Sequence, residues 1–265
     1  MTLARTLFIN TRPWRYHDDT AWRTYAALGI EYQHIPLLDM TARPLTDADQ
    51  QHLDELAKGG YRLLVVISPT VVAYAKKTLD AAYWQRLATL IELGILEVIA
   101  VGAATARALE QLGIWAHTPA VANNEGMLAM REVSCLDIGD RVLFWRGVGG
   151  RRLLSDTLCQ HGVMVQAIEW YQRIMPPNLL DNISKLTQSH YSTMAVLISS
   201  ELAFNHWQYA CNALAIKTDA FEYITLGERL AAIVRSGATK PAVHIIDTLH
   251  PKNLIDCMQR IIHPK

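Results

Sequence analysis

Glycine and hydroxyl-bearing residues stand at corners where an apolar run gives way to a helical pattern. The stretch "IAVGAATARALEQLGI" at 99–114 places Gly102 and Thr105 at such a corner, and "ITLGERLAAIVRSGA" at 224–238 repeats it with Gly227. A helix that begins there presents free N–H groups and the positive end of its dipole, which together favour a bound anion by about 0.3–1 kcal/mol. These corners can therefore hold small anionic groups.

Two serines occupy equivalent places in the sequence. Ser68 follows the apolar run 63–67, and Ser199 follows the run 195–198. Ser68 also precedes a proline, and serine as the N-cap with proline at the first helical position is an ordinary helix start that contributes about 1 kcal/mol. Helix capping and ligand contact both remain open for these two serines.

Several arginines lie close to the same corners. Arg12 and Arg146 stand just past the ends of expected strands, where they either add positive charge or are solvated loop residues. Arg151 and Arg152 begin a helix, where the dipole disfavours a cation. One of this pair is therefore expected to face a ligand or an acidic neighbour, and the other to lie on the surface.

The elements that carry these residues alternate along the whole chain. Short runs rich in Val, Ile and Leu alternate with stretches of helical periodicity, which is typical of parallel sheets covered by helices on both faces. The sequence therefore predicts an α/β fold. The expected strands are 6–10, 31–35, 63–67, 97–101, 141–145, 163–168, 195–198, 223–226 and 243–246.

Internal repeats indicate two similar halves. "VVISPTVVAY" at 65–74 matches "VLISSELAFN" at 196–205, with Ser68 opposite Ser199, and "AVGAATARAL" matches "TLGERLAAIV", with Gly102 opposite Gly227. A third matching pair, 7–38 and 143–171, occurs in permuted order, so the chain must leave one domain, build a second and return. The predicted parts are a discontinuous domain (1–36 and 174–265), an inserted domain (42–168) and linker segments (37–41 and 169–173).

Composition excludes several classes of function. Lys plus Arg equals Asp plus Glu at 25 each, so no broad positive field exists to gather nucleic acid or an anionic membrane surface. No apolar run approaches the roughly 20 residues that span a bilayer, and the N-terminus does not resemble a signal peptide. The four cysteines are widely spaced and the ten histidines form no ligand motif. We expect a cytoplasmic protein without a metal site.

In order and spacing, these motifs resemble the uroporphyrinogen-III synthase family. The resemblance rests on "INTRP", "VISPTVVAY", "IAVGAATARALEQLGI", "RVLFWRGVGGRRLLSDTLCQHGVMVQAIEWYQRI" and "VLISS". It implies two doubly wound parallel-sheet domains joined by a two-stranded linker around an open cleft. It also implies that hydroxymethylbilane loses water, inverts ring D and closes to uroporphyrinogen III without a cofactor. A monomer with a possible transient contact to hydroxymethylbilane synthase is expected.

The resemblance also implies roles for individual residues. Tyr171 matches the family's tyrosine that assists departure of the hydroxyl, and a phenol that stays protonated at neutral pH can donate to a leaving oxygen. The alternative is an aromatic residue that only packs the linker. Because the substrate is a polycarboxylate, the residues expected to bind it are Arg12, Ser68, Gly102, Thr105, Arg146, Ser199, Gly227 and Arg229.

Two corners depart from the family's pattern. Many members read Gly-Pro-Thr-Thr where this chain has Gly227-Glu228-Arg229-Leu230, and Arg229 could replace the lost threonine with a charged donor. Glu201 stands where the family usually has proline.

Two other functions compete with the family's activity. A sugar transferase could use Asp47-Ala48-Asp49 for a metal, but Thr46 three residues before Asp49 is better explained as a capped helix start. A noncatalytic small-anion binding or sensor protein would keep the same two domains without the chemistry. The presence of Tyr171 argues against it.

Overall fold

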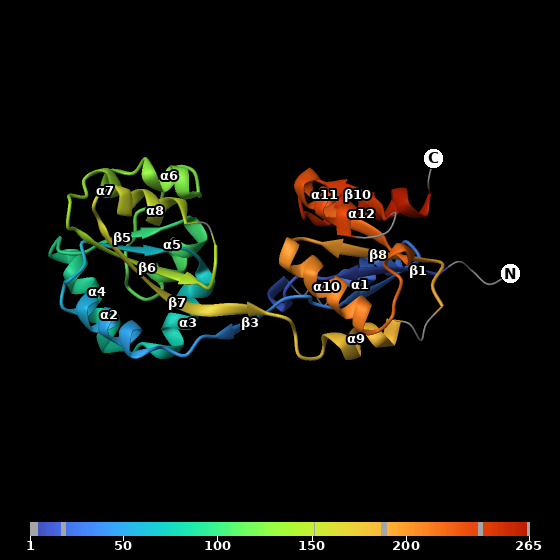
Figure 1. Cartoon of the computed structure of the whole chain (residues 1–265), viewed down its shortest axis with the longest axis horizontal. Coiled ribbons are helices and arrows are strands. Elements are labelled where there is room, and N and C mark those ends of the chain that lie inside the picture. Colours follow the sequence, from blue (N-terminus) through green and yellow to red (C-terminus); the bar gives the residue numbers. More distant parts are fainter. Residues whose placement is uncertain (1–4, 17–19, 151, 187–189, 238–240, 264–265) are drawn as a thin grey trace. The chain divides into compact units, whose positions relative to one another are not determined.

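The computed structural model describes residues 5–16, 20–150, 152–186, 190–237 and 241–263, so Arg151 lies outside the described residues. The chain divides into two compact units. Unit 1 comprises Met1–Asp39 and Ile174–Lys265, and unit 2 comprises Met40–Arg173. Each unit contains one five-stranded sheet with helices against it (Figure 1).

The sheet of unit 1 has the strand order β10-β9-β8-β1-β2, and every neighbouring pair in it is parallel. Its strands are β1 (Thr6–Asn10), β2 (Ile30–His34), β8 (Thr193–Ile198), β9 (Glu222–Leu226) and β10 (Ala242–Ile246). The helices of this unit are η1 (Trp14–Tyr16), α1 (Ala21–Ala26), α9 (Leu179–Leu186), α10 (Glu201–Ala213), η2 (Thr218–Ala220), α11 (Gly227–Gly237) and α12 (Pro251–Ile262).

The sheet of unit 2 has the order β3-β7-β6-β4-β5, and β4, β5, β6 and β7 run parallel. Its strands are β3 (Asp39–Ala42), β4 (Leu63–Val66), β5 (Glu97–Ala100), β6 (Arg141–Gly147) and β7 (Met164–Ile174). Its helices are α2 (Asp47–Ala57), α3 (Pro69–Thr78), α4 (Ala81–Glu92), α5 (Ala103–Glu110), α6 (Asn124–Leu128), α7 (Arg131–Ser134) and α8 (Leu153–Gln160).

Each sheet is buried on both faces, which is why its strands read as continuous apolar runs. On β4, Leu64 and Val66 belong to the core cluster beneath α2–α5, whereas Leu63 and Val65 belong to the cluster beneath α6–α8. Successive side chains point to opposite faces, so one strand supplies both layers. The prediction of an α/β fold with two mostly parallel sheets is confirmed.

The segments expected as linkers are partly strands of unit 2. The strand expected at 163–168 continues to Ile174 as β7, and β3 pairs with it at the edge of the sheet. The amide of Arg43 donates to the carbonyl of Trp170 at 3.0 Å, which extends this pairing beyond β3. Residues 169–173 therefore lie within the sheet and are positioned by its hydrogen bonds.

The Asp-x-Asp sequence proves to be a helix start. The Thr46 hydroxyl accepts from the amide of Asp49 at 3.2 Å, and the Asp49 carboxylate accepts from the amide of Thr46 at 2.9 Å, which is a capping box at the start of α2. Asp49 is buried, and its Oδ2 also accepts a hydrogen bond from Arg43 Nη1 at 3.0 Å. The interpretation of Asp49 as a capping residue is confirmed.

Candidate active site

In each unit, the predicted site residues lie at the carboxyl edge of the sheet. In unit 2, Ser68 follows β4, Gly102 follows β5, and Arg146 lies near the end of β6. Tyr171 of β7 pairs with Gly147, the last residue of β6. Parallel strands end at the same edge, where helix N-termini and loops meet ligands in open α/β sheets. These residues therefore share one edge.

Unit 1 repeats this arrangement. Arg12 follows β1, Ser199 follows β8 and Gly227 follows β9, and these three strands are neighbours in the sheet. Arg229 lies within the first turn of α11. The residues predicted from the sequence in unit 1 therefore lie at a common edge of this sheet as well.

The two serines differ in role. Ser68 caps α3, because its Oγ accepts from the amide of Val71 at 3.2 Å. In unit 1 the corresponding cap of α10 is Ser200, whose Oγ accepts from the amide of Ala203 at 3.2 Å. By helix capping, Ser68 therefore corresponds to Ser200, so the alignment of Ser68 with Ser199 is wrong by one residue. Ser199 lies half-buried immediately before the cap.

The corner that contains Gly102 offers backbone rather than side-chain donors. Gly102 is the N-cap of α5 with φ −173°, an extended conformation open to any residue. Thr105 is only 1% exposed, so its hydroxyl is covered. The first amides of a helix have no intrahelical acceptor, so Ala103 and Ala104 present N–H groups here.

The matching corner in unit 1 has different backbone geometry. Gly227 has φ +74°, a left-handed conformation that side chains disfavour, and a Cβ there would meet nothing within 4 Å. Arg229 Nη1 lies 3.4 Å from a carboxylate oxygen of Glu201. Two of the residues that depart from the family's pattern thus pair with one another.

Arg12 is held by a buried asparagine. Its Nε donates to Asn10 Oδ1 at 3.1 Å, its amide donates to the same oxygen at 3.2 Å, and its guanidinium lies 5.7 Å from the centre of the Tyr16 ring. Asn10 is 1% exposed and donates to the Tyr32 hydroxyl at 2.9 Å. Arg12 also lines a small pocket of about 80 Å³ within unit 1. The sheet end therefore fixes this cation in place.

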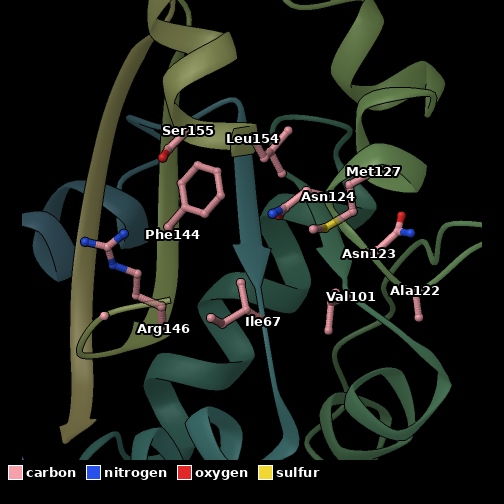
Figure 2. Close-up of a pocket in the computed structure, with 11 residues that line it drawn as sticks. Ile67, Val101, Ala122, Asn123, Asn124, Met127, Phe144, Arg146, Leu154 and Ser155 are labelled. Atoms are coloured by element: carbon pink, nitrogen blue, oxygen red, sulfur yellow. The ribbon is translucent and has the colours of Figure 1, made fainter. Parts of the chain in front are cut away.

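Arg146 lines a larger pocket, of about 260 Å³, within unit 2 (Figure 2). Its Nη2 lies 3.1 Å from Glu169 Oε1, and its Nε is buried without a hydrogen-bond partner among the described residues. Because Glu169 already neutralises Arg146, the pocket suits a flat, partly apolar group better than an isolated carboxylate. The other lining residues are Ile67, Val101, Ala122, Asn123, Asn124, Met127, Phe144, Gly149, Leu154 and Ser155.

Tyr171 faces the other side of the sheet from this pocket. The register pairs Arg146 with Glu169 and then Gly147 with Tyr171, so Trp170 is an extra residue in β7. Such a bulge changes the face on which the following side chain lies. Tyr171 therefore belongs to the core cluster beneath α2–α5 and is 4% exposed.

The Tyr171 ring has three close neighbours. It stacks on Tyr74 of α3, with ring centres 5.5 Å apart and planes at 17°. A Cβ at Gly147 would lie 2.5 Å from Tyr171 Cζ, so the ring covers this glycine closely. The Arg173 guanidinium lies 5.8 Å from the ring centre. None of the three neighbours was predicted, because no sequence spacing links Tyr74, Gly147 and Arg173.

The described part of the chain contains neither a metal cluster nor a membrane helix. No group of three or more His, Cys, Asp or Glu residues there is placed to hold a metal ion. Within the same residues, no helix has both the length and the apolar character needed to cross a membrane.

A family model described as "Uroporphyrinogen-III synthase HemD" matches residues 20–244. The chain belongs to the uroporphyrinogen-III synthase family. The family's members are cyclising lyases of haem biosynthesis, and this chain is an enzyme of that class. The Proteus mirabilis uroporphyrinogen-III synthase is 33% identical over 145 residues, which cover 53% of this chain and 67% of that protein. The Escherichia coli K12 enzyme is 27% identical over 226 residues, which cover 78% and 82%.

Solved structures agree on the fold. A mutant uroporphyrinogen III synthase from Thermus thermophilus superimposes with a TM-score of 0.59 at 16% identity, over 98% of this chain and 100% of that chain. The Helicobacter pylori uroporphyrinogen-III synthetase gives a TM-score of 0.59 at 14% identity, over the same shares. At these identities the two likenesses establish the fold alone.

Proposed function

We propose that the protein converts hydroxymethylbilane into uroporphyrinogen III, with Tyr171 as the group that assists departure of the hydroxyl. The observation that carries this proposal is that Tyr171 pairs with Gly147, the last residue of β6, at the carboxyl edge of the unit 2 sheet. Positioned acid catalysis of this kind contributes about 10²- to 10⁴-fold to a rate.

Substrate binding is proposed at the predicted corners. The substrate is a polyanion and the protein has no net charge, so the carboxylates must be held locally by helix N-termini and by fixed cations. Arg12 and the backbone amides of the corner at Gly102 supply such contacts. The pocket beside Arg146 is proposed to take one pyrrole ring, with its apolar residues against the ring and its asparagines toward ring substituents.

Most of the catalysis is proposed to come from positioning. After loss of hydroxide, the electrophilic methylene must reach the substituted position of ring D rather than the free one, and holding both ends of a flexible chain achieves this.

The activity is tested with purified protein and freshly generated hydroxymethylbilane, followed by oxidation and chromatography of uroporphyrin isomers I and III. Spontaneous closure gives isomer I, so a reaction without enzyme is the control. We expect predominantly isomer III. Isomer I at the spontaneous rate from folded protein would refute the proposal and favour a noncatalytic small-anion binding protein.

The role of Tyr171 is tested with Tyr171→Phe. The phenyl ring can keep the stack on Tyr74, so folding should be retained while the donor is lost. We expect turnover to fall by about 10²-fold, with isomer III still the product. Full activity in this variant would remove Tyr171 from the mechanism.

We further propose a cytoplasmic monomer that accepts hydroxymethylbilane during transient contact with its synthase. The support is chemical, because the substrate closes spontaneously to isomer I and a short transit time limits that loss. Sedimentation of the protein alone and with the synthase tests the monomer, and the yield of isomer III with and without the synthase tests the transfer. A stable dimer would contradict the proposed monomer. An unchanged yield of isomer III in the presence of the synthase would contradict the proposed transfer.

A further inference from the structure

Arg173 stands two residues beyond Tyr171 on β7 and shares its face of the strand, because side chains alternate along a strand. Its guanidinium lies 5.8 Å from the centre of the Tyr171 ring, within the range of a cation–π contact. Tyr171 itself is fixed by the stack on Tyr74 and by the close approach of Gly147. The cation is therefore held beside the proposed catalytic ring.

The charge of Arg173 is available for a ligand. Four other described arginines of unit 2 lie within 4 Å of a carboxylate: Arg43 with Asp49, Arg141 with Glu55, Arg146 with Glu169 and Arg152 with Asp156. Among the residues that the structure describes, Arg173 has no acidic partner, and its side chain is exposed. A guanidinium can bind a carboxylate through two parallel N–H donors, so this exposed fork is suited to an anionic substituent.

We propose that Arg173 binds a carboxylate of the substrate and thereby places the departing hydroxyl at Tyr171. The inference rests on the proposed function and extends it to a residue outside the corners at the helix N-termini. Arg173 contacts a carboxylate rather than the reacting bond, so it contributes to substrate binding and orientation. Losing it should weaken binding more than it slows the bound substrate.

The test compares Arg173→Gln with the wild type in two assays. The first is turnover of hydroxymethylbilane, and the second is binding of uroporphyrin III, a stable polycarboxylate probe, followed by fluorescence. We expect KM and the probe's Kd to rise roughly tenfold or more, as for loss of a charge-assisted hydrogen bond, with a smaller change in kcat. High salt should reduce the difference between the two proteins, because exposed charges are screened.

The matched control is Arg86→Gln. Arg86 is exposed on α4 and its guanidinium lies 5.6 Å from the centre of the Tyr83 ring, which reproduces the arginine–tyrosine contact away from the site. Arg86→Gln should leave KM and Kd unchanged. Equal losses in the two variants, an unchanged KM and Kd in Arg173→Gln, or a fall in kcat alone would overturn the assignment. Failure of the wild type to form isomer III would instead refute the proposed function. The Kd of the probe would in that case still show whether Arg173 binds a carboxylate.

Discussion

Gly147 is expected to be the residue that tolerates substitution least near the proposed catalytic group. A Cβ added at this position would lie 2.5 Å from Cζ of Tyr171 and 2.8 Å from each Cε atom. Carbon atoms in contact prefer separations of about 3.5–4.0 Å. The Gly147→Ala variant must therefore move the ring of Tyr171, the backbone of β6, or both.

The size of the effect is set by this distance. Restoring an ordinary carbon–carbon contact requires a displacement of about 1 Å. A misplacement of this size in a catalytic group can reduce a rate by about 10²-fold. Forcing a methyl group into a packed position also costs about 1–3 kcal/mol of stability. We therefore expect lower activity together with a moderate loss of stability.

The assay measures formation of isomer III by Gly147→Ala and by the wild type, with urea unfolding of both proteins to show that the variant is folded under assay conditions. We expect kcat to fall by about 10²-fold while the probe's Kd changes little, because the glycine contacts Tyr171 rather than the substrate. Wild-type kcat in a folded Gly147→Ala protein would refute the reasoning.

A double-mutant comparison separates displacement of the tyrosine from general disruption. If Gly147 acts through Tyr171, then Gly147→Ala should have almost no further effect on kcat in a Tyr171→Ala background. A similar loss in both backgrounds would mean that the added methyl group damages the site by another route.

Two further predictions concern stability. Burial alone would raise the pKa of Asp49, but hydrogen bonds from Thr46 and the neighbouring Arg43 outweigh it and hold that pKa below its usual range. Its stabilising contribution is therefore present above the unfolded pKa of about 3.9 and is lost as the pH falls through the lower folded pKa. Asp49→Asn should lower the free energy of unfolding at neutral pH by about 1 kcal/mol. It should also make the free energy of unfolding fall less as the pH is lowered through the pKa of Asp49, which urea unfolding at a series of acidic pH values measures. The same fall in the variant and the wild type would contradict the stabilising role of the Asp49 carboxylate. Ser200→Ala should cost about 1 kcal/mol by the same measurement, whereas Ser199→Ala should cost much less; the reverse order would contradict the assignment of the cap.

The sequence was sufficient to predict the sheets because both faces of each strand are buried. Runs such as 63–67 and 195–198 have no polar alternation, which indicates a parallel sheet covered on both sides. The ends of the strands were harder to predict. Apolar periodicity does not mark where β7 stops. Glu169 and Tyr171 continue the pairing with β6, and the strand itself extends to Ile174.

The site was only partly predictable for a related reason. The sequence indicates that Ser68, Gly102 and Arg146 stand at or just past the ends of expected strands, and parallel strands end at one edge of a sheet. The sequence does not indicate the face on which Tyr171 lies, because the bulge at Trp170 adds one residue and moves the next side chain to the opposite face. The environment of the tyrosine depends on this tertiary feature, which no local propensity reveals.

Two departures from the family's pattern, Arg229 beside Gly227 and Glu201 of α10, form an ion pair in unit 1. Glu201 at the start of α10 lies where the helix dipole favours a carboxylate, and Arg229 of α11 lies 3.4 Å from it. Both side chains are exposed, at 78% for Arg229 and 56% for Glu201, so the pair adds little to stability. A substrate carboxylate that approaches Arg229 must compete with Glu201. Unit 1 is therefore expected to hold the substrate mainly through Arg12, whose partner Asn10 carries no charge.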